Sequence, residues 1–417
     1  MKLSHLATHL VASEIVKISN EVNDLKSKGR AISNLTIGDL NSNIYPIPAL
    51  LKEAIQEAYN ANFTNYPPSP GIAELREVVS KDIKERYDLD YPASDIQIAG
   101  GSRPLIYTTY LSIVDEGDKV VYPVPSWNNN HFCYLSDAQK VEVETKPENN
   151  FLPTAEELRG KLDGAVLLAL CSPLNPTGTA YTEKQLKEIC DLVLEENKRR
   201  SPDQKPLYLL YDQIYALLTF GGKHVSPVGI YPEMKKYTIY IDGISKCLAA
   251  TGVRVGWAYG PTEVIAKIKA FLTHIGAWAP KPEQEATAKF WAKADAVDAF
   301  VADFKGKINH SLETLHQGIQ SLKSKGFAVD SIKPMGALYL TVKMDYVGKT
   351  APDGTVIKDT TDLVFYLINN ADAAFVPFSA FGNGREMPWF RASAGGCSLE
   401  DIQNLLPKLE KALSQLK

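Results

Sequence analysis

Two cations, Lys246 and Arg254, are the first candidates for chemistry in this chain of 417 residues. Lys246 follows an apolar run in the pair Ser-Lys, and Arg254 lies eight residues later, directly before a second apolar run. Because apolar sequence flanks both residues, we expect them to be partly buried, unlike most lysines and arginines. A lysine in such a place can form a Schiff base with an aldehyde cofactor, and an arginine can hold a phosphate.

Asp212 is an acidic residue at the end of the apolar sequence Leu-Tyr-Leu-Leu-Tyr, and Tyr215 follows three residues later. A carboxylate at the end of a buried strand loses hydration, so its ionised form needs a cationic partner. It could keep the nitrogen of a pyridine ring protonated, which would let the ring act as an electron sink. The alternative is that Asp212 caps a helix N-terminus.

A glycine-containing turn, Gly100-Gly101-Ser102, follows another apolar run, and Arg103-Pro104 then opens a predicted helix. The glycines allow close backbone approach, and the free N–H groups of a helix N-terminus bind phosphate well. Taken alone, such a turn is more often plain geometry than a ligand site. It is not a dinucleotide fingerprint, because the second half of Gly-x-Gly-x-x-Gly is missing.

Trp127 and Asn175 follow two further apolar runs. Trp127, in Pro-Ser-Trp, could stack on a flat ring, and packing in the core is the alternative. Asn175 lies in Ser-Pro-Leu-Asn-Pro-Thr-Gly, where turn formation explains most of the residues. An asparagine held between such turns could also present its amide to a ligand.

These residues must be positioned by the strands that precede them. Short β-type runs alternate with helical segments that begin at capping boxes, such as Thr154 with Glu157 and Thr182 with Gln185. We predict strands at Ile96–Ala99, Lys119–Tyr122, Val141–Glu144, Val166–Leu170, Leu207–Tyr211, Thr238–Ile241 and Val255–Tyr259. Several are continuously apolar, so the sequence predicts an α/β fold with a mostly parallel seven-stranded sheet flanked by helices. Ligands of such sheets bind beyond the C-terminal ends of the strands.

The pattern changes after about residue 290. A long helical stretch runs to about residue 325, a strand is predicted at Ala337–Val342, and an Asp/Gly/Thr-rich connection leads through two apolar runs to a helix from Leu399. A helix is also predicted at residues 13–28, ended by Gly29. We therefore expect a large cofactor-binding domain, residues 45–295, and a smaller α+β domain made of residues 1–44 and 296–417.

Composition excludes several classes of protein. With 45 basic and 49 acidic residues the formal charge is −4, which gives no basic surface for nucleic acid or acidic lipid. No apolar run reaches membrane-spanning length, and the N-terminus has no signal-peptide core. The five cysteines have no paired or metal-type spacing, so we expect a reduced cytoplasmic protein without a metal site.

Taken together, four motifs resemble one enzyme family. They are Asn-Pro-Thr-Gly, Asp-x-x-Tyr, Ser-Lys with an arginine eight residues later, and a C-terminal Arg-x-Ser. From about Ser13 to its end the chain resembles the class I/II aminotransferases, the aspartate-aminotransferase-like branch of the fold-type-I pyridoxal-phosphate enzymes. The resemblance implies pyridoxal 5'-phosphate as cofactor, and transfer of an amino group between an L-amino acid and a 2-oxo acid.

The resemblance also implies a role for each cofactor residue. Lys246 would be the Schiff-base lysine and later the proton shuttle, and Asp212 would pair with the pyridine nitrogen. Tyr215 and Asn175 would hold the phenolic oxygen of the ring, and Trp127 would stack on the ring. The residues implied for the phosphate are Gly101, Ser102, Ser245 and Arg254.

On the substrate side, the resemblance points to Arg391 in Trp-Phe-Arg-Ala-Ser as the arginine that grips the α-carboxylate, a bidentate task suited to a guanidinium. Asn175 and the backbone of Gly38 would lie beside that carboxylate. Tyr66, in a proline-rich loop, matches a tyrosine that reaches the phosphate of the partner subunit, which implies a homodimer with shared sites.

Some points stay open in the sequence. A histidine that supports the ring-pairing aspartate in some relatives is replaced by Asn130, with His131 one residue later. A dicarboxylic substrate needs a second cation, for which Arg103, Lys281 and Arg385 are candidates. Aspartate/glutamate chemistry is the preferred interpretation, and the alternative is a carbon–sulfur lyase or related elimination enzyme on the same fold. A transcription regulator that uses this fold as its sensor would carry a basic DNA-binding module, which the sequence does not show.

Overall fold

The computed structural model describes residues 3–10, 14–382, 384 and 386–417. Its largest sheet has seven strands in the spatial order β2-β8-β7-β6-β5-β3-β4. These strands are β2 (Ile96–Ala99), β3 (Lys119–Val124), β4 (Gln139–Glu144), β5 (Ala165–Cys171), β6 (Tyr208–Asp212), β7 (Thr238–Gly243) and β8 (Gly256–Tyr259). Only β8 runs antiparallel to its neighbours β2 and β7, so the predicted mostly parallel seven-stranded sheet is confirmed.

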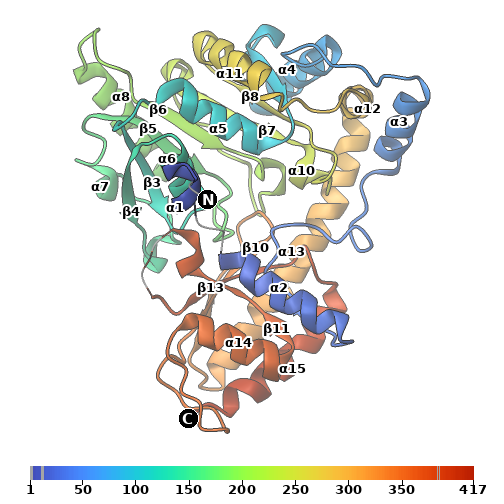
Figure 1. Cartoon of the computed structure of the whole chain (residues 1–417), viewed down its shortest axis with the longest axis vertical. Helices are drawn as coiled ribbons and strands as arrows, with labels where there is room; N and C mark the ends of the chain where they lie inside the picture. The colour runs from blue at the N-terminus through green and yellow to red at the C-terminus, as the bar shows by residue number, and fades with distance from the viewer. Residues whose placement is uncertain (1–2, 11–13, 383, 385) are drawn as a thin grey trace.

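Helices cover both faces of this sheet (Figure 1), because alternate residues of each strand point to opposite sides. The helices of this layer structure are α3 (Ala49–Asn60), α4 (Ala73–Tyr87), α5 (Ser102–Ile113), α6 (Asn129–Leu135), α7 (Ala155–Leu158), α8 (Glu183–Arg199), α9 (Pro227–Ile230), α10 (Ile244–Cys247), α11 (Thr262–Ile275) and α12 (Lys281–Trp291). In β5, Leu167 and Ala169 pack in one cluster with α5 and α11, whereas Leu168 and Leu170 pack in another with α4, α8 and α12. The capping boxes predicted at Thr154 and Thr182 start α7 and α8.

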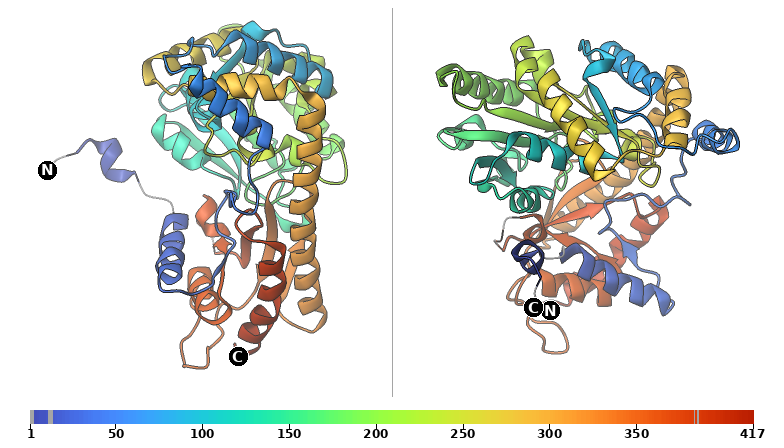
Figure 2. Two further views of the ribbon diagram at one scale, coloured as in Figure 1. Left: turned by 90° about the vertical axis from the view of Figure 1, so that its right-hand side faces the viewer. Right: turned by 45° about the horizontal axis from the view of Figure 1, so that its top comes forward.

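A second, antiparallel sheet of four strands has the order β12-β13-β10-β9. Its strands are β9 (Val329–Ile332), β10 (Tyr339–Met344), β12 (Val376–Pro377) and β13 (Trp389–Ser393), and a short parallel pair joins β1 (Ser33–Asn34) to β11 (Ala373–Ala374). The helices beside these strands are α13 (Ala294–Ser324), α14 (Thr360–Ala371) and α15 (Leu399–Ser414), with α1 (His5–His9) and α2 (Glu14–Ser27) at the N-terminus. Figure 2 shows α13 running along one side of the molecule past both sheets.

One boundary of this part differs from the prediction. The strand predicted at Ala337–Val342 begins two residues later, at Tyr339. Ala337 has a φ of 60°, which is not a strand conformation, and its N–H donates to the carbonyl of Leu218 and not to a neighbouring strand. The helix predicted at residues 13–28 is α2, and residue 13 lies outside the described residues. The division after residues 44 and 295 stays a proposal, supported by a buried cluster that joins α2 to α13, α14 and α15.

Candidate active site

A cavity of about 740 Å³ lies beyond the C-terminal ends of β3, β5, β6 and β7, and β10 and β13 of the four-stranded sheet close its opposite side. This size suits a small ligand. The predicted site residues that line it are Gly38, Ser102, Trp127, Asn175, Asp212, Tyr215, Ser245, Lys246, Arg254 and Arg391. Gly101 lies directly behind the lining at the start of α5, and Tyr66 lies outside the cavity.

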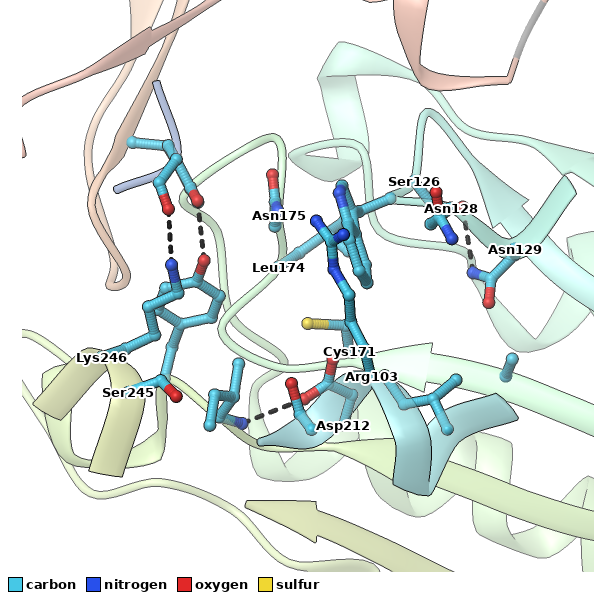
Figure 3. Close-up of a pocket in the computed structure, with 18 of the residues that line it drawn as sticks. Arg103, Ser126, Asn128, Asn129, Cys171, Leu174, Asn175, Asp212, Ser245 and Lys246 are labelled. Carbon is cyan, nitrogen blue, oxygen red and sulfur yellow. Dashed lines mark hydrogen bonds between the residues drawn. The ribbon is translucent and has the colours of Figure 1, made fainter. Parts of the chain in front are cut away.

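Lys246 enters the cavity from α10, the short helix that follows β7 (Figure 3). Its ammonium group donates a hydrogen bond to the backbone carbonyl of Gly38. Burial lowers the pKa of Lys246 to about 8, although the charge of Asp39 opposes the shift. About a tenth of the amine is therefore neutral at pH 7, far more than for a lysine of ordinary pKa, and the neutral amine is the form that acts as a nucleophile.

Asp212 ends β6, the strand next to β7, and its side chain faces the same cavity (Figure 3). Burial raises its pKa to about 6, although the N–H of Ile214 donates to Oδ1 at 3.1 Å and Lys246 lies nearby. That bond closes a turn, and the next helical element, the 3-10 turn Ala216–Leu218, begins only after Tyr215, so Asp212 is not the cap of a helix. Within the part of the chain that the structure describes, no cation lies within ion-pair distance of this carboxylate. It is available to a positively charged group in the cavity.

Arg254 and the start of α5 form a cradle of hydrogen-bond donors. The Arg254 guanidinium donates to the backbone carbonyls of Gly100 at 2.7 Å and Thr251 at 2.8 Å, and has no carboxylate partner among the described residues. Gly101 has a φ of 87°, and any side chain there would collide with this guanidinium. The backbone therefore approaches the cation closely beside the free N–H groups of the helix, and the cradle suits a phosphate.

Trp127 lies in the loop after β3, with the guanidinium carbon of Arg103 4.9 Å from the centroid of its ring. Beyond it, Asn128 and Asn129 line the cavity, and neither Asn130 nor His131 does. Asn128 has a left-handed φ of 64° and starts α6, which places the next residue toward the cavity. The amide of Asn129 donates to Ser126 at 3.1 Å (Figure 3). Neither sequence candidate for the missing histidine reaches the cavity.

Arg391 projects from β13 and is only 2% exposed. It donates one hydrogen bond to the amide oxygen of Asn175, at 2.9 Å, and one to the carbonyl of Thr36, while its Nε has no acceptor. No carboxylate pairs with it among the residues that the structure describes, which rules out an ordinary salt bridge there. A buried guanidinium without a counter-ion is costly. The arrangement therefore favours an anionic ligand at Arg391.

Tyr339 is a cavity residue that the sequence did not single out. Its hydroxyl lies 2.7 Å from the hydroxyl of Tyr215, and its ring lies 4.7 Å from the guanidinium carbon of Arg391. A side chain at Gly38 would come within 2.8 Å of the Tyr339 hydroxyl, which explains the glycine at that position. The sequence signal is weak, because a tyrosine in an apolar strand usually belongs to the core.

Two of the residues named from the sequence lie away from the cavity, and a third lies outside the residues that the structure describes. Tyr66 is 82% exposed, and its ring packs edge-on against Trp278 at 5.5 Å. Lys281 donates to the side chain of Asn65 at 3.0 Å and does not line the cavity. Arg385 lies outside the described residues.

Comparisons with known proteins agree with this geometry. A model of the family "Aminotransferase class I and II" matches residues 31–409. The aspartate aminotransferase of Bacillus subtilis (strain 168) is 28% identical over 414 residues, 99% of this chain and 100% of the relative, and that of Geobacillus stearothermophilus is 30% identical over 92% of both chains. The structure of an aspartate aminotransferase from Thermus thermophilus with maleate superposes with a TM-score of 0.87 at 26% identity, covering 99% of this chain and 100% of that one.

The chain belongs to the class I and II aminotransferases. Enzymes of this family depend on pyridoxal phosphate, and the cavity fits that group. The carboxylate of Asp212 has no cation partner among the described residues, Arg254 and Gly101 form a donor cradle, and Lys246 has a lowered pKa. The described residues include no cluster of three or more His, Cys, Asp or Glu side chains that could hold a metal ion, and none of their helices is long and apolar enough to cross a membrane.

Proposed function

We propose that this aminotransferase is of the aspartate/glutamate type and carries pyridoxal 5'-phosphate on Lys246. The observation that carries the proposal is the pair at the ends of β6 and β7. A lysine with a lowered pKa and a carboxylate without a cation face one cavity. When bound, the cofactor supplies an electron sink that makes the Cα–H bond of an amino acid acidic.

The residues of this chain then divide the remaining work. Lys246 holds the cofactor covalently and, once released, moves the proton at the substrate Cα, for which a pKa of about 8 is suitable. Asp212 keeps the ring nitrogen protonated, and Tyr215 and Asn175 donate to the phenolic oxygen of the ring. Trp127 stacks on the ring, and the phosphate is held by Gly101, Ser102, Ser245 and Arg254.

Arg391 grips the α-carboxylate of the substrate beside Asn175 and the backbone of Gly38. This assignment is supported by its burial and by its Nε, which has no acceptor. The planar fork of a guanidinium matches a carboxylate with two parallel hydrogen bonds.

We propose Arg103 for the side-chain carboxylate of a dicarboxylic substrate. Of the three candidate cations it lines the cavity, whereas Lys281 is bonded to Asn65 outside it. Among the described residues Arg103 has no acidic partner. Its guanidinium lies against Trp127, and we infer that it leaves this face when the cofactor ring is stacked there. The names of the relatives, and the dicarboxylate maleate in the Thermus thermophilus structure, support an acidic substrate.

Covalent labelling tests the cofactor assignment. The purified protein is incubated with pyridoxal 5'-phosphate, reduced with borohydride, digested and mapped by mass spectrometry. The label is expected on Lys246 and is expected to disappear in Lys246→Ala but not in the control Lys281→Ala. A label on another lysine, or no label, would overturn the assignment.

A screen of half-reactions with the twenty amino acids tests the substrate class. Aspartate and glutamate are expected to react fastest, and Arg103→Leu is expected to raise KM for both by roughly tenfold or more while leaving alanine unchanged. An equal loss with alanine would assign Arg103 to the cofactor instead. Release of ammonia and pyruvate from cysteine or cystathionine would favour the lyase alternative, which the comparisons do not favour.

We also propose a homodimer with shared sites, in which Tyr66 reaches the phosphate of the partner subunit. Its exposed ring and the exposed Tyr59 and Phe63 nearby support an interface on this surface. The test mixes Tyr66→Phe subunits with Lys246→Ala subunits at a cofactor concentration that leaves Tyr66→Phe largely unloaded.

In such hybrids one site carries both changes and the other carries neither, so activity above both parents is expected. Tyr59→Phe subunits serve as the control, because Tyr59 is also an exposed tyrosine, and its hydroxyl bonds Glu283 within its own chain. A fully active monomer would contradict the proposal.

A further inference from the structure

Tyr339 connects the four-stranded sheet to the cofactor side of the cavity. It is the first residue of β10, it is fully buried, and its hydroxyl has one hydrogen-bond partner among the described residues, the hydroxyl of Tyr215 at 2.7 Å. Tyr215 follows β6 of the seven-stranded sheet. The contact therefore joins two hydroxyls that come from different sheets.

Counting hydrogens gives the direction of this bond. Each phenol has one hydrogen to donate. If the hydrogen of Tyr215 goes to the phenolic oxygen of the cofactor, the hydrogen between the two hydroxyls must come from Tyr339. A donated hydrogen bond of this kind polarises the next one in the chain and strengthens it.

The surroundings of the two phenols favour the same direction. Burial raises the pKa of Tyr339, but the Arg391 guanidinium over its ring and the bond to Tyr215 oppose the rise. Burial raises the pKa of Tyr215 well above its usual value, and the charge of Tyr339 adds to that rise. The guanidinium that lies over the Tyr339 ring thus favours Tyr339 as the donor.

We propose that Tyr339 is a positioning residue that acts through Tyr215. Its hydroxyl donates to Tyr215 and so keeps the single hydrogen of Tyr215 directed at the phenolic oxygen of the cofactor. The inference rests on the proposed function, since it needs the cofactor on Lys246. This role of Tyr339 makes the charge state of the cofactor depend on β10, which pairs with β13, the strand that carries Arg391.

A pH titration of visible absorbance in the cofactor-loaded protein tests this proposal. On protonation, the nitrogen that links Lys246 to the cofactor gains a proton that it shares with the phenolic oxygen. A hydrogen-bond donor to that oxygen competes for the same lone pairs and therefore lowers the pKa of the linking nitrogen. Tyr339→Phe keeps the ring and removes only the hydroxyl, so the pKa is expected to rise by about 0.3–1 unit, the upper limit being the loss of one neutral hydrogen bond.

Two comparisons separate this role from a merely structural one. Tyr366→Phe makes the same change at a tyrosine beside the same sheet, whose hydroxyl bonds Ala412 at 2.8 Å away from the cavity, and should leave the titration unchanged. In a Tyr215→Phe background, adding Tyr339→Phe should produce no further rise, because the effect passes through Tyr215.

The contrary outcomes are equally definite. An unchanged or lowered pKa in Tyr339→Phe would overturn the proposal, and so would the same rise in both backgrounds. A wild-type protein without a titrating visible band would overturn the proposed function instead. A titrating wild type with an unshifted Tyr339→Phe variant would overturn only the role of Tyr339.

Discussion

On the side of the cavity formed by the seven-stranded sheet, Asp212 ends strand β6 and Lys246 lies three residues after strand β7. On the opposite side, Arg391 bonds Thr36 and Asn175, which lie 355 and 216 residues away in the chain. The first side is brought together by the register of neighbouring parallel strands. The second exists only when the four-stranded sheet and the N-terminal segment are packed in place.

Two arginines show the same contrast. Arg254 is bonded to a carbonyl of its own loop and to that of Gly100, 154 residues away, so its position is fixed by backbone at the edge of the seven-stranded sheet. Arg391 donates to the amide oxygen of Asn175 and to the carbonyl of Thr36, and its Nε has no acceptor. It is also more deeply buried than Arg254. The difference indicates that changes on the first side should affect the cofactor, and changes on the second side should affect the substrate.

The largest effect is expected from Asp212→Asn. The amide keeps the shape but cannot hold the ring nitrogen protonated, so kcat should fall by about 10²–10³-fold, the range for losing one electrostatic stabiliser of a transition state. Labelling at Lys246 should persist, which separates catalysis from cofactor binding. Near-normal turnover would show that the carboxylate has another role.

The two arginines give the next largest effect. Arg391→Lys keeps the charge but loses the planar fork, so kcat/KM for amino acids should fall roughly tenfold or more, with the visible spectrum unchanged. Arg254→Lys should instead weaken cofactor affinity, measured by fluorescence titration of the apoprotein, and leave substrate KM nearly constant in the loaded enzyme. If both variants lose cofactor affinity equally, the contrast between the two sides is wrong.

The pH dependence of cofactor attachment gives a further test. Because burial lowers the pKa of Lys246 to about 8, about a tenth of the amine is neutral at pH 7 and about nine tenths at pH 9. The initial rate of borohydride-trapped labelling of the apoprotein should therefore rise nearly tenfold over this range and level off above it. An amine with an ordinary pKa would still be gaining reactivity at pH 10.

The smallest effect is expected at Thr341, whose hydroxyl donates to the carbonyl of Thr177 at 2.8 Å and ties β10 to the loop that carries Asn175. Thr341→Val should lower the free energy of unfolding by about 1 kcal/mol because a buried carbonyl loses its partner. Thr314→Val serves as the control, because the bond of its hydroxyl to the carbonyl of His310 is exposed to solvent, and its effect should stay within about 0.5 kcal/mol. A tenfold change in KM for Thr341→Val would mean that this bond also positions Asn175.

The sequence predicted the first side of the cavity better than the second for a physical reason. Several strands of the large sheet, such as β5 and β6, are nearly continuous apolar runs, and polar residues that follow neighbouring parallel strands lie at the same edge of the sheet. Asn129 was missed because the left-handed turn at Asn128 decides which residue of α6 faces inward. Tyr339 was missed because the partner of its hydroxyl depends on tertiary packing, which an apolar strand pattern does not contain.

Helix α13 has a mechanical consequence for the cavity. It has 31 residues and is therefore about 46 Å long, and it starts only three residues after α12 ends at Trp291. The joint between them is short, and Lys293 in it has non-helical angles of φ −97° and ψ 70°. Val297 and Val301 bury the first turns of α13 in the same cluster as α4 and α12, and Arg86 of α4 pairs with Asp298 at 2.7 Å. Since β9 and β10 pack against the same helix further along, α13 acts as a strut that sets the distance between the wall that carries Tyr339 and the sheet that carries Lys246.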